Sequence, residues 1–279
     1  SAFCNAGFDL MGHWQPYSSM TRYADDPLVL GTVMALIVLG GIGFFVWDDI
    51  AKNQWHFRNY TLQTKVVLTT TALLLILPFL WFWLCEFVHW NGMSTGKQAL
   101  SALFQTVCPR TAGFNNVDLN QLSGGSKLLT ILLMLVGGSP SSTAGGIKTT
   151  TLAILLLALR AAFTSDHQVH CFGRRIPAQV ITRTLVVSVL YGTLFLVASM
   201  ALIQLEPVTM EEALFECASA IGTVGLTLGI TPELGAVSKG ILILLMYLGR
   251  VGGLTLVYAV SGTGKRLHYT LPEESIGIG

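Results

Sequence analysis

The chain has 279 residues, 52% of them hydrophobic and only 11% Asp, Glu, Lys or Arg. A soluble domain carries about 25% charged residues, so the composition favours a membrane protein. The formal net charge of +1 gives no indication of nucleic-acid binding, and the five cysteines show no CxxC or paired spacing. The 29 glycines are more than simple lipid-facing helices need.

Five apolar segments are long enough to cross a bilayer, which takes about 20 residues of helix. They cover roughly residues 28–50, 64–88, 127–162, 180–205 and 237–261. The third is too long for one span and is interrupted by the Gly- and Ser-rich run 137–146, which predicts a broken helix around a loop at membrane depth. Two shorter helices, over 97–108 and 211–221, are each followed by a glycine turn, and we interpret them as re-entrant half-helices.

Charge distribution predicts the orientation of these spans. Cations outnumber acids in the loops 47–65, 160–183 and 262–279, whereas acids outnumber cations on the opposite side. By the positive-inside bias, the first set and the C-terminus are cytoplasmic. We expect a multi-pass protein in the lipid bilayer of the inner (plasma) membrane. The acidic outer face would concentrate cations.

Three short stretches align on one glycine each: residues 4–8, 110–114 and 222–226. The glycines are 106 and 112 residues apart, and the second and third copies share the order span, half-helix, glycine turn, span. The first copy lacks its leading span, so we expect a fragment of a longer chain with units at 1–63, 64–175 and 176–279. The expected fold is an all-α polytopic membrane protein of pore-loop repeats.

This unit suits a cation pathway. The negative end of a half-helix dipole would face a central cavity, and an extended strand returning from it could aim carbonyls at a dehydrated K⁺ ion. Glycine permits the required backbone angles, and Thr223-Val224-Gly225 matches the start of the K⁺-channel TVGYG signature. The predicted K⁺-coordinating residues are Cys4, Asn5, Ala6, Gly7, Arg110, Thr111, Ala112, Gly113, Gly222, Thr223, Val224 and Gly225.

With these motifs and those at 138–150 and 219–229, the whole chain resembles the Trk/Ktr/HKT superfamily of K⁺ transporters, in particular the bacterial Ktr membrane subunit. The resemblance implies four repeats around one pore, of which this chain holds the third, the fourth and the tail of the second. It also implies a homodimer on a cytosolic ring of nucleotide-binding subunits. K⁺ would be the transported ion, with Na⁺ as a candidate activating or coupling ion and no organic cofactor on this chain.

The resemblance further implies that the loop beneath the filter gates the pore. Its residues are Gly138, Ser139, Pro140, Ser141, Ser142, Thr143, Ala144, Gly145, Gly146 and Lys148. A cation within a span marks a functional site, so we expect Arg250 to set a barrier in the cavity and tether this loop, or else to form a structural hydrogen bond. Arg110 is expected to brace the filter, with Glu216 as its candidate partner. Lys148 either ends the loop or extends toward the cytoplasm.

Three alternatives remain open at this point. The first is a Na⁺-permeable transporter of the same superfamily. The second is an intramembrane serine hydrolase using Ser139, Ser141 or Ser142, although the six histidines all lie in loops or at span ends. The third is a non-conducting receptor or scaffold.

Overall fold

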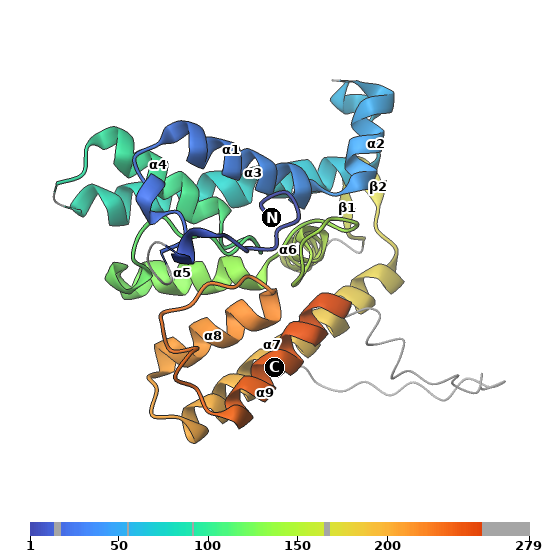
Figure 1. Ribbon diagram of the computed structural model, residues 1–279. Helices are drawn as coiled ribbons and strands as arrows, with labels where there is room; N and C mark the ends of the chain where they lie inside the picture. The colour runs from blue at the N-terminus through green and yellow to red at the C-terminus, as the bar shows by residue number, and fades with distance from the viewer. Residues whose placement is uncertain (14–17, 55, 91, 165–167, 253–279) are drawn as a thin grey trace, which may run out of the picture.

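The computed structural model describes residues 1–13, 18–54, 56–90, 92–164 and 168–252, and these are mostly helical (Figure 1). In chain order the helices are α1 Pro27–Ile42, α2 Phe44–Asn53, α3 Leu62–Trp81, α4 Thr95–Val107, α5 Gly124–Leu135, α6 Thr149–Phe163, α7 Ala178–Leu205, α8 Met210–Gly222 and α9 Ala236–Val251. A π turn, Phe82–Glu86, and a 3₁₀ turn, Phe87–His89, extend α3. Further 3₁₀ turns are Met11–His13, Thr21–Tyr23, Phe57–Asn59 and Leu119–Gln121.

Two of the predicted spans are single long helices. Leu62–His89 and Ala178–Leu205 are each 28 residues long and apolar enough to cross a membrane. Their exposed faces carry large apolar side chains, such as Leu77 at 62% and Met200 at 67% exposure. Contiguous exposed apolar surface of this kind suits contact with lipid.

The predicted span over 28–50 is not one straight helix. Its two parts, α1 and α2, meet at an angle of 90°. Gly43 lies at the corner with φ 100°, a conformation that is open to glycine and rarely adopted by residues with a side chain. The second part holds Asp48, Asp49 and Lys52, which explains why it leaves the apolar course of α1.

The long apolar segment 127–162 is interrupted where the glycines and serines predict it. Helix α5 ends at Leu135 and α6 begins at Thr149. Each half is too short to cross a bilayer by itself. The last predicted span is described only as far as Gly252, so residues 253–261 and the predicted cytoplasmic tail lie outside the described residues.

The described fold is not purely helical. Strands β1, His170–Cys171, and β2, Arg174–Arg175, form a short antiparallel hairpin between α6 and α7. Phe172 and Gly173 at its turn both have positive φ, as a tight hairpin turn requires. An all-helical expectation misses this hairpin because two-residue strands leave no periodic pattern in the sequence.

Each of the two short helices lies in its own apolar core. Helix α8 packs against α5, α7 and α9, with Phe215 and Ile221 almost completely buried (Figure 1). Helix α4 packs against α1 and α3 and buries Phe104 and Val107. The segments that follow these helices are therefore held at a fixed position inside the bundle.

Candidate functional site: three glycine segments and an interrupted helix

The three aligned segments share an unusual backbone conformation. In each, the glycine and the residue two positions before it have positive φ. The angles are 49° and 71° for Asn5 and Gly7, 65° and 79° for Thr111 and Gly113, and 54° and 93° for Thr223 and Gly225. Positive φ is costly for a β-branched residue such as threonine, so the surrounding structure must hold these segments in place. The alignment made on the glycines thus coincides with a repeated backbone geometry.

The glycines of the three segments meet at one place. A Cβ atom added to Gly7 would lie 2.7 Å from the carbonyl oxygen of Ala112 and 3.4 Å from that of Val224. A Cβ atom added to Gly113 would collide with the carbonyl oxygen of Val224 and lie 3.5 Å from the Cα atom of Gly7. Glycine is therefore required for segments more than 100 residues apart in the chain to approach this closely.

Backbone N–H groups of these segments donate hydrogen bonds to carbonyls nearby in the chain. The Ala112 N–H donates to the Cys108 carbonyl at 3.0 Å, and the Val224 N–H donates to the Ser219 carbonyl at 2.8 Å. In all three segments, no hydrogen bond among the described residues ends on the carbonyls from the residue with the first positive φ to the glycine. These oxygens are available to coordinate a cation, because carbonyl rings can replace the hydration shell of K⁺.

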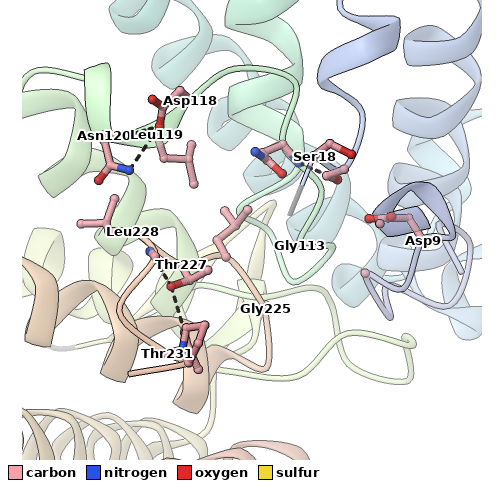
Figure 2. Close-up of a pocket in the computed structure, with 17 residues that line it drawn as sticks. Asp9, Ser18, Gly113, Asp118, Leu119, Asn120, Gly225, Thr227, Leu228 and Thr231 are labelled. Carbon is pink, nitrogen blue, oxygen red and sulfur yellow. Dashed lines mark hydrogen bonds between the residues drawn. The ribbon is translucent and has the colours of Figure 1, made fainter. Parts of the chain in front are cut away.

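A cavity of about 550 Å³ opens on one side of the three glycines, all of which line it. Figure 2 shows the residues that line it, with Gly113 and Gly225 near the middle of the view and Asp9 and Asp118 on opposite sides. The remaining lining is rich in hydroxyl and amide groups, including Thr227. Acidic walls concentrate cations and repel anions, so the cavity suits a cation vestibule.

The interrupted segment between α5 and α6 has a defined fold. Val136 and Ile147 form an isolated parallel bridge, and the Gly137 N–H donates to the Ile147 carbonyl at 2.8 Å. The hydroxyl groups of Ser139 and Thr149 lie 3.0 Å apart and both side chains are fully buried. Ser139 is therefore paired with another hydroxyl group and not with a histidine base, so it lacks the arrangement of a serine nucleophile.

The interrupted segment is attached to the bend between α1 and α2. The Ser139 N–H donates to the Gly41 carbonyl at 2.9 Å, and the Phe44 N–H donates to the Ser141 carbonyl at 3.0 Å. A Cβ atom on Gly40 would collide with the Phe3 carbonyl. The sequence indicates only close helix packing for Gly40 and Gly41, whereas the structure places both glycines against the loop or the first segment.

Thr143 connects the loop directly to the glycine segments. Its hydroxyl group contacts the Phe3 carbonyl at 3.2 Å and the Asn5 side-chain oxygen at 3.3 Å. The Asn5 amide in turn donates to the Arg110 carbonyl and the Thr111 hydroxyl, both at 3.3 Å. These contacts were not predicted, because nothing in the sequence links a side chain near the N-terminus to a loop 138 residues later.

Two cationic side chains contact consecutive carbonyls of the loop. Arg250 Nη1 donates to the Thr143 carbonyl at 2.5 Å, and Lys148 Nζ donates to the Ala144 carbonyl at 2.6 Å. Arg250 lies in the last turn of α9. Lys148 precedes α6 and folds back on the loop, instead of extending toward the cytoplasm.

The expected pair of Arg110 and Glu216 is not formed. Arg110 is 5% exposed, and the ion pairs among the described residues do not include it. Glu216 instead accepts hydrogen bonds from the hydroxyl groups of Thr227 and Thr231, in the loop that follows the third segment. The hydroxyl groups satisfy the carboxylate locally, so it does not need a guanidinium partner.

Comparison with known proteins shows the family to which this chain belongs. The model of a family of cation transport proteins, TrkH, matches residues 1–264. The potassium/sodium uptake protein NtpJ of Enterococcus hirae is 40% identical over 100% of this chain and 62% of its own length. The Ktr system potassium uptake protein B of Vibrio alginolyticus is 38% identical over 100% of this chain and 61% of its own length.

A solved structure has the same fold. The crystal structure of the potassium transporter TrkH from Vibrio parahaemolyticus superposes with a TM-score of 0.78 at 21% identity, over 94% of this chain and 57% of that one. The chain thus spans about three fifths of the length of the relatives that it matches. With the family model and these full-chain matches together, the chain belongs to the TrkH family of cation transport proteins.

Proposed function

We propose that this chain forms most of a K⁺ uptake pathway across the plasma membrane, with residues 4–7, 110–113 and 222–225 as three of the segments of its selectivity filter. The observation that carries the proposal is the repeated left-handed backbone at the three segments, whose glycines meet at one place. Free carbonyls at that place and an acidic cavity beside it are what a dehydrated cation would need. The missing part of the filter would come from residues outside this sequence.

The loop over 138–148 is the gate in this proposal. It lies between the first glycine segment, the bend of α1 and α2, and the end of α9. Side-chain hydrogen bonds from Thr143, Lys148 and Arg250 hold it there. Because each such bond contributes only about 0.5–1.5 kcal/mol, a modest change in free energy can release the loop. The positive charge of Arg250 at this depth would also oppose the passage of cations while the loop is closed.

The relatives suggest the partners. One of them is a potassium uptake protein of a Ktr system, and a homodimer on a cytosolic ring of nucleotide-binding subunits is the assembly that we propose for the full-length protein. The basic stretch from Arg160 to Arg183 is a candidate contact for such a ring, and a solvated loop is its alternative. The C-terminus would lie on the same, cytoplasmic side.

The decisive experiment is ion flux into liposomes that contain the full-length protein. We expect uptake of ⁸⁶Rb⁺, a K⁺ tracer, above that of empty liposomes, and competition by external K⁺ at lower concentrations than by Na⁺. Uptake equal to that of empty liposomes would contradict the proposal and favour a receptor or scaffold. Equal competition by the two ions would instead favour a Na⁺-permeable transporter, which the potassium/sodium relative keeps in consideration. Adding Na⁺ at constant K⁺ would show whether Na⁺ activates transport.

A further inference from the structure

A buried carboxylate lies at the end of α3. Glu86 is 5% exposed and lies in the π turn that ends this helix. Its two oxygens accept from the Ser123 N–H at 3.0 Å and from the Ser123 hydroxyl group. The Trp90 indole N–H donates to it as well, at 3.3 Å. Ser123 is the N-cap residue of α5, so Glu86 joins the end of α3 to the beginning of α5.

The same arrangement of a carboxylate and a helix start recurs one unit later. Glu206 follows the last residue of α7, and one of its oxygens accepts from the Gly235 N–H at 2.8 Å and from the Ser238 hydroxyl group at 2.6 Å. Gly235 is the N-cap residue of α9. Each carboxylate therefore sits at the end of the helix that opens its unit and holds the beginning of the helix that closes it.

The residues whose N–H groups bind the two carboxylates occupy equivalent positions in the two units. Ser123 and Gly235 are 112 residues apart, which is the spacing of the filter glycines Gly113 and Gly225. The two glutamates are 120 residues apart, because the stretch from the carboxylate to the filter glycine is shorter in the last unit. The same contact is thus made to equivalent donor sites, although the connecting chain differs in length.

Each contact closes a loop around one half-helix and its glycine segment. The first loop runs from Glu86 to Ser123 and contains α4 and residues 110–113; the second runs from Glu206 to Gly235 and contains α8 and residues 222–225. Closing a loop restricts the conformations open to everything within it. The carboxylate contact therefore limits how far the two ends of each loop can move apart, and with them the half-helix that the loop contains.

We propose that Glu86 and Glu206 are equivalent positioning residues, which fix the distance between the helix that opens each unit and the helix that closes it, and so hold the glycine segment between them at its place in the filter. This inference rests on the proposed function. Among the described residues, the hydrogen bonds of the two carboxylates reach neither the glycine segments nor the interrupted loop, so the carboxylates act through the helices that they join. Their role is geometric, and a glutamine, whose amide oxygen can accept both hydrogen bonds, should replace Glu206 closely.

The test compares Glu206→Ala with Glu206→Gln in the full-length protein, measured as the ratio of ⁸⁶Rb⁺ to ²²Na⁺ uptake in liposomes. Glu233→Ala is the matched control, since Glu233 is an exposed acid in the same loop. We expect the alanine variant to lower the ratio about fivefold or more, the glutamine variant to restore it to within twofold of wild type, and the control to leave it unchanged. Melting temperatures measured on the same samples separate loss of folding from loss of selectivity.

The outcomes are distinguishable. If Glu206→Ala melts at a lower temperature but keeps the wild-type ratio, the carboxylate is only a structural cap and the inference is overturned. If Glu206→Ala does not fold, Ser238→Ala, which removes one of the two hydrogen bonds, takes its place under the same criteria. A wild-type protein without ⁸⁶Rb⁺ uptake would contradict the proposed function itself, whereas a selective wild type with an unaffected Glu206→Ala ratio contradicts only this inference.

Discussion

Replacement of Gly225 by serine tests the filter directly, because the structure separates backbone strain from steric collision at this position. A Cβ atom at Gly225 would meet no atom within 4 Å, so a serine side chain has room. The cost comes from the φ of 93°, which is unfavourable for any residue with a side chain. A residue of left-handed backbone costs about 1–2 kcal/mol, and a rotation that relieves it would move the adjacent carbonyls away from the ion.

We expect Gly225→Ser to retain uptake but to lower the preference for K⁺ over Na⁺ by about fivefold to thirtyfold, the factor that corresponds to 1–2 kcal/mol. The assay is the ratio of ⁸⁶Rb⁺ to ²²Na⁺ uptake into liposomes with the full-length protein. Gly113→Ala should be more severe and abolish uptake, because its Cβ atom would collide with the Val224 carbonyl.

Gly240→Ala is the matched control for both substitutions. Gly240 lies inside α9 with no atom within 4 Å of an added Cβ, and alanine is favoured over glycine in a helix by about 1 kcal/mol. Its uptake ratio should equal that of wild type and its melting temperature should not fall. A wild-type ratio in Gly225→Ser, or normal selective uptake by Gly113→Ala, would refute the assignment of these segments to the filter.

The remaining predictions concern the loop and one half-helix. Arg250→Ala should raise ⁸⁶Rb⁺ flux because it removes the hydrogen bond to the Thr143 carbonyl, and unchanged flux would leave Arg250 a packing role only. Deletion of residues 139–144 should raise flux further in the same assay; if flux stays at the wild-type level, this loop is not the gate. Thr209→Ala should destabilise the start of α8 by about 1 kcal/mol in thermal unfolding, because it removes half of a capping box. Hydrogen bonds from Thr209 lower the pKa of Glu212 below its ordinary value of 4.5, so this loss should be present at neutral pH and shrink as the pH falls below about 4.5; an undiminished loss in acid would contradict it.

The sequence predicted well those features that depend on the residue types of a short segment. The run of glycine and serine between 137 and 146 interrupts a helix because those residues favour other backbone conformations, and the structure breaks there. The three glycines could be aligned because positive φ strongly favours glycine, which leaves a mark in the sequence at each repeat. The threonines at the other positive φ could not be recognised in this way, since threonine is common in ordinary extended and helical backbone.

Features that depend on the path of the chain were missed. The apolar run continues past Gly43 as far as Trp47, so hydropathy does not mark the position of the 90° bend, although charged residues follow in α2. Charge alone predicts a pair of Arg110 and Glu216, but the hydroxyl groups of Thr227 and Thr231 hydrogen-bond to the glutamate instead. A single sequence does not reveal which of several polar neighbours lies within reach.

The contacts of Thr143 and Asn5 imply that the proposed gate and filter are mechanically coupled. The Thr143 hydroxyl contacts Asn5, and the Asn5 amide contacts the backbone and the hydroxyl group of the second glycine segment. Withdrawal of the loop must break the first of these contacts and leave the Asn5 side chain without one of its partners. Because a buried polar group that loses a partner costs about 1–3 kcal/mol, the closed loop and the ordered first segment stabilise each other. Opening of the loop should therefore loosen the end of the proposed filter that contacts the loop. An ion that orders the filter should in turn favour the closed loop, unless a partner supplies the free energy to withdraw it.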